Sequence, residues 1–287
     1  MPNHHVKIDP MDGVAGLCTH HIWEGPALPR YAYLPIGCLI AAIRLLTLLV
    51  LSVLAWPLPQ AAKRIIYCTL LFVMGIKITC NLSTLAVKNL TDGRVVALNH
   101  LSVCDYLPLL AMPSAIGTMF DVSHPLVKAM FFLLSKCSGK CFWNVNDKRE
   151  LAKNLHAFRN TPQGTALYVA PEATINNGLG LYTFRPSLLN RGFAVVPLAM
   201  RLRLPLGLTA APLHSSATRS FLRLLMMPWL SFEMIYLQPQ HRNENQSSED
   251  FARQIQMCIA TELGIAATPW TREDKHDYRK ASLGLHP

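Results

Sequence analysis

The chain has 287 residues, of which 51% are apolar and 15% are charged, whereas about 25% of residues are charged in an ordinary soluble domain. This composition excludes a disordered or fibrous protein, and the length predicts one or two domains. The formal charge of +10 favours an anionic partner. Because the basic residues are scattered and not interleaved with aromatic ones, we expect a lipid partner and no nucleic acid.

A long apolar segment lies near the N-terminus, at residues 36–56, and carries a single charge, Arg44. A central Arg costs about 2.5 to 3.5 kcal/mol on insertion, and the Leu, Ile and Val residues return roughly 4 to 7 kcal/mol. A second apolar segment, 65–76, follows a proline-containing turn and is too short to span a bilayer. These lengths predict a hairpin or monotopic membrane anchor within residues 31–88, after a polar N-terminal segment, 1–30.

Beyond the anchor, short apolar runs alternate with amphipathic segments. The former predict strands and the latter helices, one of them capped by Asp147. Such alternation predicts an α/β sandwich with a partly parallel sheet, in a domain that covers residues 89–265. A polar tail, 266–287, follows. The predicted strands are 94–99, 165–170, 193–201 and 232–239, and the predicted helices are 124–137, 148–159 and a closing helix from Ser247 to Gly264.

The eight cysteines are expected to be free thiols, because residues 1–30 contain no apolar core of a signal peptide. Cys137 and Cys141 lie four residues apart, but no second ligand pair has matching spacing. No metal site is therefore predicted.

The sequence NHLSVCD, residues 99–105, places Asp105 five residues after His100 at the end of a predicted buried strand. Open-sheet proteins build their sites at the carboxyl ends of strands. A neutral imidazole can take a proton from a substrate hydroxyl if a carboxylate holds its other ring nitrogen. Taken alone, the pair favours a histidine that a carboxylate satisfies for stability.

A second polar block, APEATINNG at residues 170–178, also follows a predicted buried strand. In isolation it reads as a polar turn. Because it brings Glu172, Thr174, Asn177 and Gly178 to the same sheet edge as His100, we expect the imidazole and the Glu172 carboxylate to face one crevice.

These two blocks, followed by the VVPLA strand at 195–199, resemble motifs one, three and four of the glycerolipid acyltransferase family. The resemblance implies a glycerol-phosphate acyltransferase-like α/β sandwich with a membrane-inserted helical hairpin, acyl-CoA as co-substrate and no cofactor. It implies that His100 is the general base and that Asp105 orients it. The substrate-binding positions that it implies are Asn99, Pro171, Glu172, Thr174, Asn177, Gly178, Val196 and Pro197.

Two positions depart from the family pattern. The second family motif usually carries an Arg for the acceptor phosphate, and this chain has Val145 there. Loss of such a contact could cost about 1.5 to 3 kcal/mol in acceptor binding. Ala173 replaces the glycine of the third motif and adds a methyl group where backbone freedom is wanted.

The function that we expect is transfer of a fatty acyl group from acyl-CoA to a lysophospholipid or glycerol-phosphate hydroxyl, at the endoplasmic reticulum membrane and lipid droplet surface, with the catalytic domain cytosolic. The alternative is a catalytically weak or inactive protein of the same membranes that acts in lipid droplet organisation or protein quality control. Vertebrate relatives continue into a ubiquitin-binding CUE domain, which this sequence does not contain, so ubiquitin-system partners are not expected.

Overall fold

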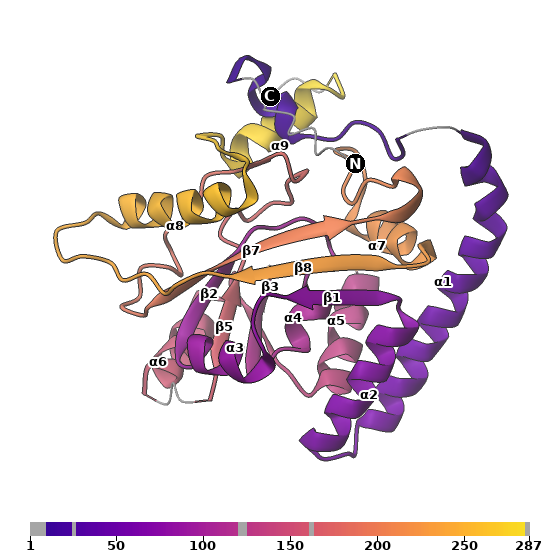
Figure 1. Ribbon diagram of the computed structural model, residues 1–287, viewed down its shortest axis with the longest axis horizontal. Helices are drawn as coiled ribbons and strands as arrows, with labels where there is room; N and C mark the ends of the chain where they lie inside the picture. The colour runs from indigo at the N-terminus through magenta and orange to yellow at the C-terminus, as the bar shows by residue number, and fades with distance from the viewer. Residues whose placement is uncertain (1–9, 25–26, 120–124, 161–163, 285–287) are drawn as a thin grey trace.

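The computed structural model describes residues 10–24, 27–119, 125–160 and 164–284. A seven-stranded sheet lies at its centre, in the order β1-β8-β7-β2-β5-β3-β4 (Figure 1). β7 and β8 are antiparallel, and the other neighbouring strands are parallel, as the sequence predicted in part. The strands are β1 (Ile76–Cys80), β2 (Arg94–Leu98), β3 (Ala115–Met119), β4 (Phe142–Asn144), β5 (Ala166–Val169), β7 (Val195–Arg203) and β8 (Leu230–Tyr236).

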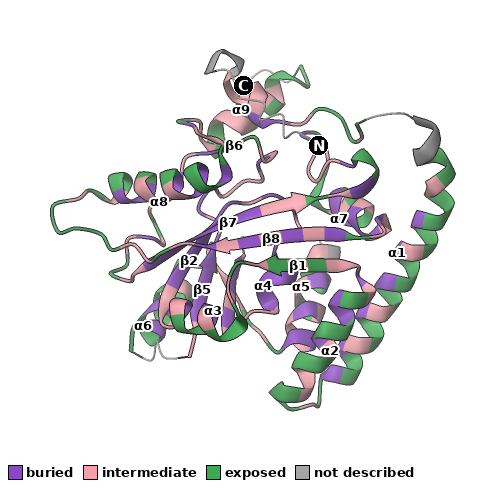
Figure 2. Ribbon diagram, in the orientation of Figure 1, coloured by how far each residue is buried: buried purple, intermediate pink, exposed green. Residues whose placement is uncertain are grey.

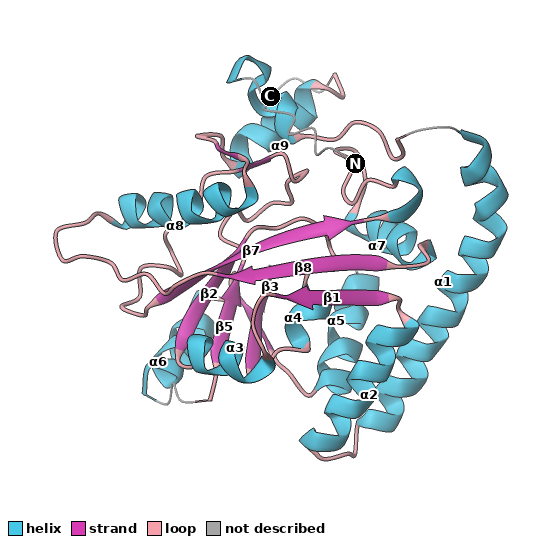
Figure 3. Ribbon diagram, viewed as in Figure 1, coloured by secondary structure: helices cyan, strands magenta, loops and turns pink. Residues whose placement is uncertain are grey.

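Helices cover both faces of the sheet (Figure 3). Successive strand residues point to opposite faces, so Val95 and Ala97 of β2 pack in one core and Val96 and Leu98 in the other. The first core contains α6 (Lys148–Asn160) and α8 (Ser248–Leu263). The second contains α2 (Gln60–Val73), α3 (Thr84–Thr91), α4 (Tyr106–Leu110), α5 (Pro125–Ser138) and α7 (Ala217–Met226). The predicted α/β sandwich is confirmed.

The N-terminal apolar segments form a helical hairpin of α1 (Ala27–Ala55) and α2, which packs beside α5 and α7 (Figure 1). α1 is long and apolar enough over Tyr31–Ala55 to cross a membrane. Figure 2 shows buried and exposed positions alternating along it. One stripe, with Arg44 and Leu48, is buried against the domain. The outward stripe is apolar and exposed at Leu39, Ile43, Leu46, Leu49, Val50, Val53 and Leu54.

The single charge in α1 points into the protein. Arg44 is 4% exposed, and its guanidinium donates from Nε to the carbonyl of Val73 at 3.0 Å. Its other nitrogens donate to the carbonyls of Leu225, Met227 and Pro228. Each of these carbonyls lies at or just beyond a helix end, where backbone oxygens lack intrahelical partners. Arg44 therefore joins α1 to the ends of α2 and α7 and is kept away from lipid.

Most predicted elements match observed ones within a few residues. α5 corresponds to the predicted helix 124–137, whose first residue lies outside the described ranges. α6 begins after Asp147, whose Oδ1 accepts the N–H groups of Arg149 and Glu150. β1, β3 and β4 were not predicted. The apolar residues of β1 follow α2 so closely that they read as its continuation, although the helix ends at Val73.

The C-terminal segment that the sequence sets apart as a polar tail contains regular structure. β9 (Ala266–Ala267) pairs with β6 (Gly180–Leu181). α9 (Arg272–Ala281) begins with a capping box between Thr271 and Asp274 and packs on the 3-10 segment η1 (Pro10–Leu17). The first and last helical segments of the described chain thus lie together (Figure 1).

Candidate active site

His100 and Asp105 lie in the loop between β2 and α4. Asp105 is 1% exposed, and its Oδ2 lies 2.9 Å from His100 Nδ1. The same oxygen accepts the N–H groups of Leu101 at 2.6 Å and Ser102 at 3.0 Å, and Oδ1 accepts the Ser102 hydroxyl at 2.6 Å. Four contacts fix the carboxylate, so the imidazole has one preferred orientation.

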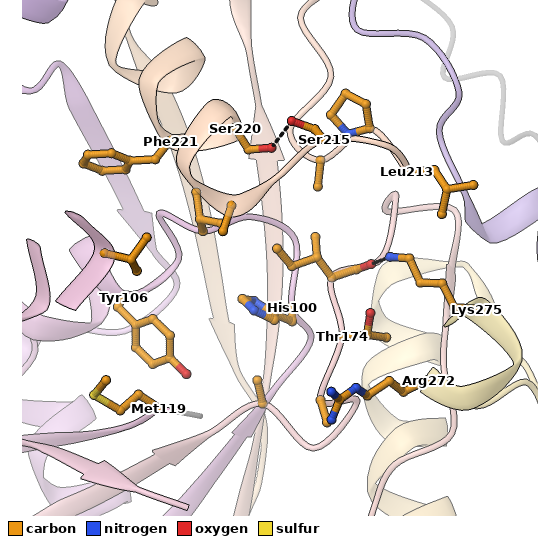
Figure 4. Close-up of a pocket in the computed structure, with 18 of the residues that line it drawn as sticks. His100, Tyr106, Met119, Thr174, Leu213, Ser215, Ser220, Phe221, Arg272 and Lys275 are labelled. Atoms are coloured by element: carbon orange, nitrogen blue, oxygen red, sulfur yellow. Dashed lines mark hydrogen bonds between the residues drawn. The ribbon is translucent and has the colours of Figure 1, made fainter. Parts of the chain in front are cut away.

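The His100 ring lines a cavity of about 440 Å³, at whose centre Figure 4 shows it. A carboxylate beside Nδ1 favours the tautomer with the proton on Nδ1, which leaves Nε2 as the acceptor. The side chain is 18% exposed. The histidine is therefore arranged to take a proton from a bound molecule.

One wall of this cavity is apolar and is formed by the helices against which α1 packs. Val127, Met130 and Phe131 belong to α5 and Phe221 to α7, and α1 packs against both helices. Thr174, Ser215 and Ser220 add hydroxyl groups (Figure 4). An amphipathic molecule suits such a lining, because one end meets carbon and the other meets donors and acceptors.

Glu172 does not face the cavity, and the expectation that its carboxylate shares the crevice with the imidazole is wrong. It is fully buried. Its Oε1 accepts the backbone N–H of His100 at 2.9 Å and the amide of Asn176 at 2.7 Å, and its Oε2 accepts the N–H of Tyr182 at 2.8 Å. Burial raises the pKa of Glu172 to about 8, against the lowering effect of these donors and of Lys275. Its carboxyl group joins the two loops.

Three other predicted substrate-binding residues lie in the interior. Asn99 Nδ2 donates to the Met200 carbonyl at 3.0 Å, and its Oδ1 accepts the Met200 N–H at 2.8 Å. This amide therefore joins β2 to β7. Val196 and Pro197 are buried within β7. These three side chains line neither the His100 cavity nor two further cavities among the described residues.

Of the remaining residues of the second block, two line cavities and two shape the loop. Thr174 lines the His100 cavity, and Pro171 lines a neighbouring cavity of about 550 Å³. Asn177 Nδ2 donates to the Gly16 carbonyl at 2.8 Å. Gly178 has a φ of +81°, which glycine adopts without a steric penalty. The substrate-binding roles of these residues stay predictions.

The neighbouring cavity contains the position where the family motif has its Arg. Val145 lies in its wall, and Tyr106, Ala170 and Ala173 line both cavities. Valine offers no hydrogen bond to a phosphate. Lysine and arginine side chains also line this cavity, namely Lys148, Arg159, Arg185 and Arg191.

α9 is part of the site, although the sequence did not predict it. Arg272, Lys275, His276 and Arg279 line the same cavity as His100. The segment lacks an apolar stripe, so it reads as a tail. Two signals could have revealed it: the T-x-x-D capping pattern at Thr271, and basic residues spaced three and four apart, which share one face of a helix.

Within the described ranges, no group of three or more His, Cys, Asp or Glu side chains could hold a metal ion. The eight cysteines are free thiols. Cys137 is buried and Cys141 is exposed.

Comparisons with known proteins give two groups of sequence relatives, while no protein-family model matches the chain. "Lipid droplet-regulating VLDL assembly factor AUP1" is 23% identical in Danio rerio and 25% identical in Homo sapiens, over 86% of this chain and 57% and 58% of those proteins. "Glycerol-3-phosphate acyltransferase 3" of Mus musculus is 22% identical over 87% of this chain and 59% of that protein. The chain thus spans just over half the length of the curated relatives it matches.

Among solved structures, the 1-acyl-sn-glycerophosphate acyltransferase PlsC from Thermotoga maritima matches with a TM-score of 0.49 and 14% identity, over 71% of this chain and 78% of that one. The blocks at 99–105 and 170–178, together with the apolar segment 36–56 and the segment 236–264, also resemble AUP1, ancient ubiquitous protein 1. The matches to AUP1 confirm that resemblance. The chain is therefore related to AUP1 and to a glycerolipid acyltransferase, as its sequence blocks predicted.

Proposed function

We propose that the chain is a membrane-bound acyltransferase that moves a fatty acyl group from acyl-CoA to the hydroxyl of a lysophospholipid or a glycerol phosphate. One observation carries this proposal. The His100 imidazole lines a half-apolar cavity while the buried Asp105 carboxylate holds its Nδ1 at 2.9 Å. Similarity to "Glycerol-3-phosphate acyltransferase 3" supports the same chemistry.

The reaction needs no protein nucleophile. Nε2 of His100 takes the proton of the acceptor hydroxyl as its oxygen attacks the thioester carbonyl carbon. The carbon–sulfur bond then breaks, the acyl group stays on the acceptor oxygen, and the thiolate receives the proton from the imidazolium to give the free thiol of CoA. Asp105 stabilises the imidazolium while it exists. A positioned general base of this kind contributes about 10² to 10⁴ in rate.

The hairpin supplies the membrane contact in this proposal. α1 touches the domain from Tyr33, whose hydroxyl donates to the Met226 carbonyl at 2.8 Å, to Ser52, whose hydroxyl donates to the Leu133 carbonyl at 3.1 Å. Because the helix is attached over this length, we propose that it lies along the membrane surface with its outward apolar stripe in lipid. A monotopic anchor suits both the endoplasmic reticulum and a droplet monolayer, with the catalytic domain on the cytosolic side.

The test compares purified wild type with His100→Ala, using acyl-CoA and a panel of lysophospholipids and glycerol 3-phosphate. We expect turnover to fall by about 10² to 10⁴ in the variant with its thermal unfolding unchanged. His241→Ala is the matched control, because His241 is exposed and lines none of the cavities described above. Equal turnover in wild type and His100→Ala would overturn the proposal.

A second candidate function is a non-catalytic role at lipid droplets. The printed name of the AUP1 relatives favours it, as does Val145 at the position of the family Arg. This candidate predicts that wild type and His100→Ala bind phospholipid-coated oil droplets equally and that neither transfers an acyl group. Loss of turnover in His100→Ala alone would remove it as the sole function.

A further inference from the structure

The inward face of α9 is a row of basic side chains. Arg272, Lys275, His276 and Arg279 occupy positions i, i+3, i+4 and i+7, which share one side of a helix. All four line the cavity that contains His100. Figure 4 shows Arg272 and Lys275 beside Thr174, on the side of the cavity across from Tyr106.

No carboxylate belongs to the described lining of this cavity. Asp105 and Glu172 are both buried behind the loops. Of the three acids of α9, Glu273 pairs with Arg185, Asp274 caps the helix through Thr271, and Asp277 Oδ1 lies 3.8 Å from His276 Nδ1; none of the three lines the cavity. The cavity therefore has one sign of charge, and such a lining attracts anions.

Three contacts hold α9 in place as a wall of the cavity. Lys275 Nζ donates to the Ile175 carbonyl in the loop after β5 and lies 5.5 Å from the centre of the Tyr182 ring. Tyr278 lies 3.2 Å from His20 Nε2 through its hydroxyl. Burial lowers the pKa of Lys275. Arg272 and Arg279 are more exposed than Lys275.

We infer that this face of α9 binds a phosphate group of a substrate in the His100 cavity. The inference rests on the proposed function. It assigns to α9 the phosphate contact that the Arg of the second family motif makes and that Val145 cannot make. Arginine forks bind phosphate oxygens through paired, charge-assisted hydrogen bonds. The phosphate belongs either to the acceptor or to the thioester donor, since both carry phosphate esters.

The experiment measures binding rather than turnover, by titrating the full chain in detergent with two matched pairs of probes. Glycerol 3-phosphate is compared with glycerol, and coenzyme A with pantetheine. The double variant Arg272→Gln and Arg279→Gln removes two charges from the cavity. Its control, Lys153→Gln and Lys280→Gln, removes two charges from residues that do not line it. Every chain also carries His100→Ala, so the result does not depend on catalysis.

We expect the double arginine variant to weaken binding of one phosphate probe by about tenfold or more, with its phosphate-free partner unchanged. A loss for glycerol 3-phosphate assigns the acceptor phosphate to α9, and a loss for coenzyme A assigns the donor phosphates. If neither phosphate probe is weakened beyond the lysine control, the inference is wrong. If binding is weakened but wild type shows no turnover, the phosphate site stands and the proposed acyl transfer fails.

Discussion

The loop after β2 and the loop after β5 each contain one buried carboxyl group at the same edge of the sheet, but the two groups hold different partners. Asp105 holds an imidazole that lines a cavity, as well as two backbone N–H groups. Glu172 holds two backbone N–H groups and the amide of Asn176. Only the first carboxylate is connected to a group that can exchange a proton with a bound molecule.

The loop after β2 also depends on the loop after β5. One of the N–H groups that Glu172 accepts belongs to His100 itself, at 2.9 Å. The backbone of His100 is thus fixed by the loop after β5, and its ring by Asp105. The PE block, which the resemblance associates with the acceptor, here positions the candidate base through its carboxyl group and contributes Thr174 to the cavity.

The largest effect should come from Asp105→Asn. An amide that donates to Nδ1 moves the imidazole proton to Nε2, and it cannot stabilise the imidazolium, so acyl transfer should fall by about 10² to 10⁴. The measurement is kcat with acyl-CoA and the best acceptor of the panel. If His100 and Asp105 act as a unit, the double variant His100→Ala and Asp105→Asn should be no slower than His100→Ala alone. Independent, multiplying losses would contradict the assigned roles.

Glu172→Gln should instead act on stability, and its effect should depend on pH. In the variant, the NH₂ group of glutamine replaces a carboxyl oxygen that accepts hydrogen bonds from N–H groups. Two donors then face each other, which lowers the free energy of unfolding by about 1 to 3 kcal/mol at acidic pH. The folded chain holds the Glu172 proton up to about pH 8, whereas the ordinary pKa is 4.5. Wild type therefore loses stability as pH rises from about 4.5 to 8, and the deficit of the variant should shrink over that range.

Urea unfolding of both chains at several pH values tests this difference. Glu244→Gln, in an exposed loop, is the control, and its difference from wild type should stay constant. A deficit of Glu172→Gln that stays constant between pH 4.5 and 8 would mean that the three N–H donors outweigh burial and keep the carboxylate charged, because a lowered pKa changes stability only below about pH 4.5. That result would mean that burial does not raise the pKa of Glu172.

The sequence predicted the parts of the site that depend on short-range pattern. His100 and Asp105 lie five residues apart after an apolar strand, and their pairing needs only the local loop. The direction of Glu172 could not be predicted, because it depends on donors from Tyr182 and from His100, 72 residues away. α9 was not predicted because polar contacts, such as that of Lys275 with Ile175, hold it in place. It has no apolar stripe that a sequence pattern could reveal.

The smallest expected effect concerns Ala173, next to Glu172. Its φ is +54°, a left-handed conformation in which a β-carbon costs about 1 to 2 kcal/mol. Glycine removes that cost but gains conformational entropy in the unfolded chain, worth about 0.4 to 1 kcal/mol. Ala173→Gly should therefore stabilise the fold by about 0.5 to 1 kcal/mol, measured by urea unfolding.

Ser114→Gly provides the matched control for this last change. Ser114 also has a positive φ, +51°, but it lines neither the His100 cavity nor its neighbour. A similar gain in both variants would mean that Ala173 is an ordinary strained turn residue. If acyl transfer also changes in Ala173→Gly alone, the methyl group that lines both cavities restricts what they bind. No gain at Ala173, with a gain at Ser114, would show that the loop after β5 relaxes elsewhere and that its backbone is less fixed than the hydrogen bonds of Glu172 imply.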